Sequence, residues 1–182
     1  MTILRDSTNA KHREVESLPL IQCLMKGEAT IPIYVSYLFE LKEIYRVLEN
    51  LAIKFDLLKD LDGIERYNKI EEDLNELDSN YKREITNSAK KYINHLEELS
   101  TKNPNLLFAH VYVRHMGDLY GGKLMARLVP GSGKCYQFED RPKIIKVFNE
   151  RLTINLADEA NLAFDYFIDI FKELWEIKPL TK

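Results

Sequence analysis

The sequence predicts an all-α, single-domain protein of seven or eight helices, and three observations support this class. Apolar residues recur at spacings of three and four along most of the chain. No stretch alternates with the period of a strand, and Pro or Gly residues mark the ends of the helical segments. The chain has 182 residues without a repeat or linker, so we expect one domain over residues 1–182. Its apolar content of 45% is enough for a hydrophobic core.

The first helix is expected over about residues 3–16, where the apolar spacing is regular. One face of this helix consists of Leu4, Thr8, His12 and Val15. His12 is therefore expected to point toward the core. A single histidine on such a face is more often a hydrogen-bonded core residue than a ligand, so the pattern alone favours a structural role.

Three further helices are expected in the first half of the chain. A short one follows Pro19 and ends at Gly27, and a long one begins at Thr30 and continues to about Phe55. The next is an amphipathic helix over residues 64–77. Its polar face is expected to be solvated and consists of Glu65, Arg66, Lys69, Glu72 and Asp73.

The second half of the chain continues the helical pattern. A helix is expected from about residue 81 or 85 to 99, with His95 outside its apolar stripe and therefore exposed. Residues Cys135–Phe138 are expected to be extended. Asp140 should cap the helix that follows it, and Asn155 should open the last helix, which has a strongly apolar face.

Composition excludes several classes of protein. The net charge of −3 provides no case for binding nucleic acid. No segment has 18 consecutive apolar residues, and the N-terminus lacks the apolar part of a signal peptide, so we expect a soluble cytoplasmic protein without a membrane span. The two cysteines, Cys23 and Cys135, allow at most one disulfide and favour a reducing compartment.

The most unusual segment is a helix expected over residues 104–129, for which Asn103-Pro104 makes a suitable start. One stripe of this helix consists of Leu107, Val111, Arg114, Asp118 and Gly121. Gly117, Gly121 and Gly122 lie inside it, and each costs about 1 kcal/mol of helix stability relative to alanine. The missing side chains could let the helix lie against a flat ligand or kink around it. Close helix packing or a chain break is an equally good explanation from periodicity alone.

Two sequence motifs favour the interpretation that the glycines lie against a flat ligand. The segment Tyr112–Gly122, YVRHMGDLYGG, resembles the distal-helix signature of heme oxygenases, which commonly reads Tyr-x-Arg-x-x-Gly-Asp-Leu-Ser-Gly-Gly. The segment Thr8–Ser17, TNAKHREVES, resembles the proximal-helix motif of the same family, Thr-x-x-x-His-x-x-Ala-Glu-Asn. The resemblance extends without a gap over residues 4–27 and returns at Glu159–Phe164, so it covers about half of the chain.

This resemblance implies a heme-oxygenase-like multi-helix bundle, with heme b sandwiched between the proximal N-terminal helix and a glycine-kinked distal helix. His12 would be the proximal iron ligand, Glu16 would orient its imidazole, and Arg5 would reach an anionic edge of the heme. The catalytic residues implied are Arg114, Gly117, Asp118 and Gly121. Other heme contacts are expected from Tyr112, Gly122, Lys146, Arg151 and Phe164.

The chain also departs from the family pattern. Tyr120 stands where the distal signature usually has serine. Relatives carry a Lys-x-x-x-Arg pair that binds the heme propionates, whereas this chain has Lys143, Lys146 and Arg151 in a different register. Iron ligation and the distal carboxylate therefore follow from the resemblance more firmly than the propionate contacts do. The plain alternative for Arg114 and Asp118 is an exposed ion pair, worth less than about 1 kcal/mol.

The implied activity is oxidative cleavage of heme to biliverdin, with release of carbon monoxide and ferrous iron. Dioxygen is consumed, and the electrons come from outside, for example from reduced ferredoxin, because the chain has no flavin or nicotinamide motif. A bilin reductase would act downstream. Two alternatives stay open: a non-catalytic heme-binding protein, and a thiaminase-like enzyme on the same scaffold. The latter needs an activated nucleophile, and neither Cys23 nor Cys135 lies in a motif that indicates one.

Overall fold

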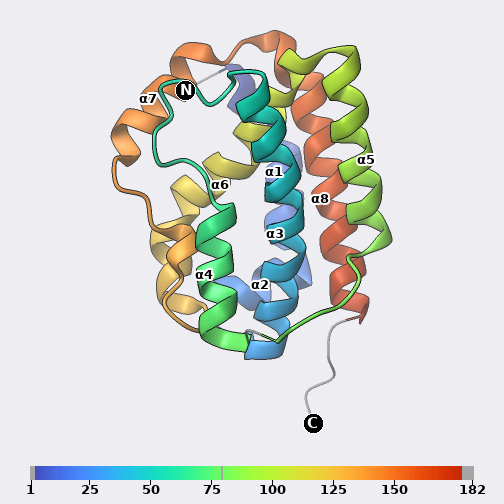
Figure 1. The fold of residues 1–182 in the computed structure, drawn as a ribbon, viewed down its shortest axis with the longest axis vertical. Coiled ribbons are helices and arrows are strands. Elements are labelled where there is room, and N and C mark those ends of the chain that lie inside the picture. The colour runs from blue at the N-terminus through green and yellow to red at the C-terminus, as the bar shows by residue number, and fades with distance from the viewer. Residues whose placement is uncertain (1–2, 79, 178–182) are drawn as a thin grey trace.

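The computed structural model describes residues 3–78 and 80–177, and these form eight α-helices and three 3₁₀ turns (Figure 1). The ends of the expected 1–182 domain, residues 1–2 and 178–182, lie outside the described residues. The α-helices are α1 (Ile3–Ser17), α2 (Pro19–Met25), α3 (Ile31–Lys54), α4 (Tyr67–Asp78), α5 (Asn87–Lys102), α6 (Leu107–Leu128), α7 (Arg141–Arg151) and α8 (Ala157–Ile177). The 3₁₀ turns are η1 (Pro104–Leu106), η2 (Lys134–Tyr136) and η3 (Ile154–Leu156). The prediction of an all-α fold is confirmed.

Two long helices hold the bundle together. α8 packs against α1, α2, α5 and α6, while α3 packs against α4, α5 and α6 (Figure 1). The buried apolar side chains form one continuous core, because both α3 and α8 bury residues on more than one side. Within the described ranges, none of the helices combines the length and apolar character needed to cross a membrane.

The predicted helix starts are partly correct. Asp140 caps α7 as expected, since its carboxylate accepts a hydrogen bond from the backbone N–H of Lys143 at 3.1 Å. Asn103 makes no such side-chain bond. This helical segment begins instead with the 3₁₀ turn η1, whose first residue is Pro104, and continues directly into α6. The helix expected over 104–129 is therefore present, but its first turn is tighter than predicted.

Two predictions about polar segments are wrong. Asp73 is 1% exposed, and its carboxylate accepts hydrogen bonds from the backbone N–H groups of Lys134 and Cys135 at 2.8 and 2.9 Å. These bonds close the 3₁₀ turn η2, which is why Cys135 and Tyr136 lie in a turn, whereas Gln137 is extended as predicted. Arg66 is 3% exposed, and its guanidinium donates to backbone carbonyls, including that of Gln137 at 2.8 Å. Both side chains were expected in the solvated face of the helix, but they support the loop that precedes α7.

Candidate active site

One side of α6 faces solvent and carries two of the three glycines. We call it the open face of α6, and it consists of Gly117, Tyr120, Gly121 and Leu124. A Cβ atom added at Gly117 or Gly121 would have no neighbour within 4 Å among the described residues. Packing inside the chain therefore explains neither glycine. The helix also continues past both, so the chain break is excluded, and at both glycines the helix backbone is open to a ligand.

Gly122 has a different environment. It is buried, and an added Cβ would lie 2.9 Å from the carbonyl oxygen of Tyr136 and 3.0 Å from Nη2 of Arg141. Helix α6 thus approaches η2 so closely that only glycine fits at this position. The structure accounts for Gly122 by packing, and we do not include it in the open face.

A buried polar cluster lies beside the open face on α6. The carboxylate of Asp118 accepts a hydrogen bond from the hydroxyl of Tyr45 on α3, and its Oδ1 lies 3.2 Å from Nη2 of Arg114. Asp118 and Arg114 are each 8% exposed, and Tyr45 is fully buried. The Arg114 guanidinium also lies 4.7 Å from the ring centre of Phe167. This burial rules out the interpretation of Arg114 and Asp118 as an exposed surface pair.

The protonation of this cluster follows from its burial and charges. Burial raises the pKa of Tyr45 well above its ordinary value, so the hydroxyl keeps its proton and remains a donor. Burial alone would lower the pKa of Arg114, but the oxygens of Tyr45 and Asp118 raise it well above its usual value. Asp118 therefore lies between a neutral donor and a permanent cation. Such an environment can hold a water molecule at the carboxylate.

Tyr45 was not distinguished from its neighbours in the sequence. It lies 73 residues from Asp118, in a helix rich in tyrosine, and no local spacing separates it from the others. Only the packing of α3 against α6 selects it.

His12 lies at the margin of the core rather than inside it. Its side chain is 50% exposed, although α1 packs against α8. The Nδ1 atom is 3.5 Å from Oε2 of Glu16, and the ring lies edge-on to Phe164 with a centroid separation of 6.1 Å. The prediction that His12 points into the core is wrong, but the geometry leaves Nε2 accessible to a ligand, with no hydrogen bond to any residue of 3–78 or 80–177.

Tyr112 brings α6 close to α1. Burial raises the pKa of Tyr112, while a hydrogen bond with Thr8 and the charge of Arg5 act in the opposite direction. Arg5 itself is exposed. The structure thus places Arg5 and Tyr112 near each other on two helices that carry the two sequence motifs.

A groove of about 730 Å³ separates the end of α6 from α7. Tyr120 lines it, which makes the groove continuous with the open face of α6. Three cationic side chains also line it, namely Lys123, Arg141 and Lys146. Arg151 does not, because its Nη1 donates to the carbonyl of Lys59 at 3.0 Å and its guanidinium covers the ring of Phe108 at 4.2 Å. Of the two propionate partners expected from the sequence, the structure places only Lys146 in the groove.

Comparisons with known proteins agree with the motifs. The model of the heme oxygenase family matches residues 1–173. Heme oxygenase 1 of Synechocystis is 27% identical, with 94% of this chain and 82% of the relative covered. The heme oxygenase of the alga Rhodella violacea is 29% identical, with 94% and 85% covered.

Solved structures give the same result for the fold. The heme oxygenase of Leptospira interrogans superposes with a TM-score of 0.83 at 26% identity, covering 94% of this chain and 97% of that chain. The heme complex of Synechocystis heme oxygenase-1 superposes with a TM-score of 0.81 at 23% identity, covering 94% and 90%. The helical bundle expected from the sequence is thus the one found in these structures.

Proposed function

The chain belongs to the heme oxygenase family, and from this premise we propose that heme is bound between α1 and the open face of α6, where it is cleaved to biliverdin, carbon monoxide and ferrous iron. The observation that carries this assignment is the open space over Gly117 and Gly121, directly beside the buried carboxylate of Asp118. A flat substrate can approach the helix backbone there and meet a carboxylate that can hold a water molecule.

The described residues fit heme as substrate. His12 offers an accessible imidazole nitrogen, and Glu16 lies on the other side of the ring, where it can orient it. Phe164 supports the imidazole from α8. When bound, heme supplies both the iron that activates dioxygen and the ring that is oxidised. A related heme oxygenase of Synechocystis was solved in complex with heme, which supports heme b as the ligand of this chain.

The cluster of Arg114, Asp118 and Tyr45 is proposed to deliver protons. Arg114 holds one oxygen of the Asp118 carboxylate in place, and the Tyr45 hydroxyl fixes the other oxygen. The carboxylate can then hold a water molecule at the open face and pass a proton through it. Gly117 and Gly121 let the helix backbone come close to the reacting ring. The bound substrate then excludes bulk water from this face of the helix.

The groove beside α7 is proposed to receive the heme propionates. Lys146, Lys123 and Arg141 outnumber the acidic side chain that also lines this groove, Glu150, so the net positive lining suits two carboxylates. Arg5 is proposed to assist from α1. Arg151 is occupied by Lys59 and Phe108, so we assign it a structural role. Electrons are proposed to come from an external donor such as reduced ferredoxin, and a bilin reductase would take the product.

The thiaminase-like alternative is not supported by the cysteines. Both thiols are buried, and burial raises the pKa of Cys135 well above its ordinary value, which keeps it from acting as a thiolate nucleophile. An experiment distinguishes a heme oxygenase from a protein that only binds heme.

The purified chain is mixed with hemin in air, ascorbate is added as reductant, and the visible spectrum is followed. An oxygenase forms a Soret band that then decays to a bilin spectrum; a persistent Soret band would refute catalysis.

A further inference from the structure

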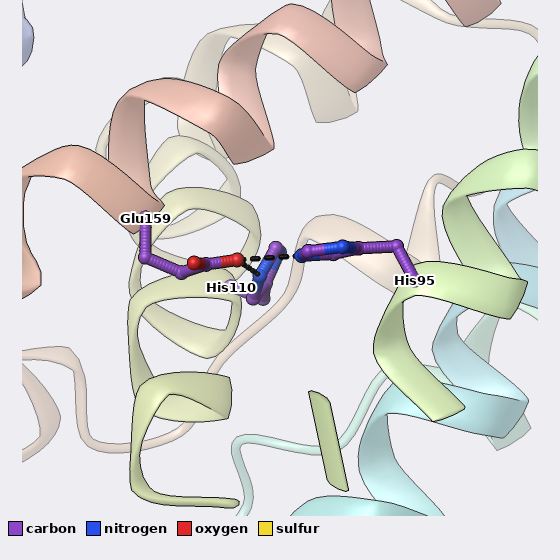
Figure 2. A group of neighbouring side chains, drawn as sticks. All are labelled: His95, His110 and Glu159. Carbon is purple, nitrogen blue, oxygen red and sulfur yellow. Dashed lines mark hydrogen bonds and ion pairs between the residues drawn. The ribbon is translucent and has the colours of Figure 1, made fainter. Parts of the chain in front are cut away.

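A second cluster of ligand-type side chains lies outside the heme site. His95 of α5, His110 of α6 and Glu159 of α8 point toward one another from three helices (Figure 2). We propose that this cluster binds a first-row divalent cation, with Zn²⁺ as the ion that matches it best. The sequence did not indicate this, because His95 was expected to be exposed; its side chain is only 21% exposed, since it packs against Tyr166 with a centroid separation of 5.1 Å.

The donor atoms converge on one point. Nε2 of His95 is 2.6 Å and Nε2 of His110 is 2.8 Å from the same oxygen, Oε1 of Glu159. One donor atom from each residue lies within 4.8 Å of the other two. Two imidazoles and a carboxylate form the ligand set of many three-residue zinc sites, with bonds of about 2.0–2.2 Å. To admit the ion, each N···O pair must widen by about 0.5 Å, and water would complete the coordination.

The surroundings of His110 suit a metal ligand. Its ring is fully buried, and its Nδ1 atom lies 2.8 Å from the hydroxyl of Tyr92. Binding of a cation at Nε2 requires the proton to sit on Nδ1, where it can donate to the Tyr92 oxygen. Metal-bound histidines are usually oriented by such a bond on the other ring nitrogen.

Zn²⁺ binding needs Nε2 of both imidazoles free of its proton, because a metal ligand must be deprotonated. The buried surroundings of His110 favour its neutral form, since burial lowers its pKa. The ion then takes the place of the hydrogen bonds that join both histidines to Oε1 of Glu159. The site is also accessible, because the side chains of His95 and Glu159 are 21% and 13% exposed. Rotation of the His95 side chain can provide both the entry path and the extra space.

The same contacts could instead serve only as a hydrogen-bonded clamp between α5, α6 and α8. In that arrangement both Nε2–H groups donate to Oε1 of Glu159, and the three helices are joined without an ion. The two arrangements differ in a measurable way. A cation that binds only the folded chain raises its thermal stability with concentration, whereas a clamp does not respond.

The test uses the full-length, heme-free protein and Zn²⁺ alone, followed by calorimetric titration and by melting curves. Co²⁺ then replaces Zn²⁺, because its visible absorption reports coordination by nitrogen and oxygen. The variants are His95→Gln and Glu159→Gln, which keep polar side chains at the half-buried positions. Two matched controls are used. His12→Ala removes the exposed pair of His12 and Glu16, and Glu98→Gln changes an exposed carboxylate on α5.

We expect one Zn²⁺ per parent chain, and a loss of at least about 10- to 100-fold in affinity in either cluster variant, because loss of a ligand costs no less than loss of a residue that orients one. Both controls should bind as the parent does, and the Zn²⁺-dependent rise in melting temperature should disappear only in the cluster variants. The absence of stoichiometric binding, or parental binding in His95→Gln, would overturn the proposal and leave a hydrogen-bonded clamp. Loss of binding in His12→Ala would overturn it as well, because the ion would then lie at the heme site.

Discussion

Two adjacent glycines on α6, Gly121 and Gly122, should respond differently to substitution by alanine. Gly121 lies in the open face, where an added Cβ has no neighbour within 4 Å among the described residues. Gly121→Ala should therefore gain the helix propensity of alanine, about 1 kcal/mol. For a chain of 182 residues this corresponds to a rise of about 2–4 °C in the melting temperature of the heme-free protein.

Gly122→Ala is the matched control. Its Cβ would lie 2.9 Å from the backbone oxygen of Tyr136, which cannot move without shifting η2. Overpacking of this kind costs about 1–3 kcal/mol, which cancels or exceeds the gain in propensity. We therefore expect Gly122→Ala to be neutral or destabilised by up to about 2 kcal/mol. Thermal melts of the two heme-free variants, measured beside the parent, provide the comparison.

Heme binding supplies the second half of the test. Gly121→Leu should also keep or raise the stability of the heme-free protein, but its side chain would occupy the space proposed for the substrate. If overpacking costs about 1–3 kcal/mol there too, the dissociation constant for hemin should rise about 5- to 150-fold. Parental hemin affinity and an unchanged bilin isomer pattern in Gly121→Leu would refute the proposal that heme lies on this face.

Four further outcomes are expected. His12→Ala should stay folded but lose normal iron ligation, seen in the spectrum of its hemin complex, and added imidazole should restore part of the activity; parental turnover without imidazole would exclude His12 as the ligand. Asp118→Ala should bind hemin nearly as the parent does, yet form little bilin in the ascorbate assay, and parental bilin yield would end its proposed role. Asp73→Ala should lose about 1–3 kcal/mol of unfolding free energy in urea, because the N–H groups of Lys134 and Cys135 lose their acceptor, whereas Glu72→Gln, at a partly exposed position of the same helix, should cost less than about 1 kcal/mol because it weakens only surface ion pairs. Cys135 should react with iodoacetamide only after unfolding, measured by mass spectrometry, since burial raises its pKa; rapid alkylation of the folded chain would contradict this.

Local signals were sufficient to predict most helices. The extents of α3, α6 and α7 follow from apolar spacing and from prolines near their starts, because these features act within one or two turns of the chain. The family motifs likewise identified His12, Asp118 and the glycines as site candidates without any structure. Segments whose conformation depends on distant partners were predicted less well, and the turn η2 is the clearest example because Asp73 closes it from 61 residues away.

The fold class, the family and the residue types at the candidate heme site could all be predicted from the order of the amino acids. Only the tertiary structure separated Gly121, which faces open space, from Gly122, which packs against Tyr136. Only the structure selected Tyr45 as the partner of Asp118 and joined His95 to Glu159. Sequence periodicity shows only which side of a helix is apolar, so it cannot predict these contacts. The partners of a buried polar group are set by packing between segments that are remote in the chain.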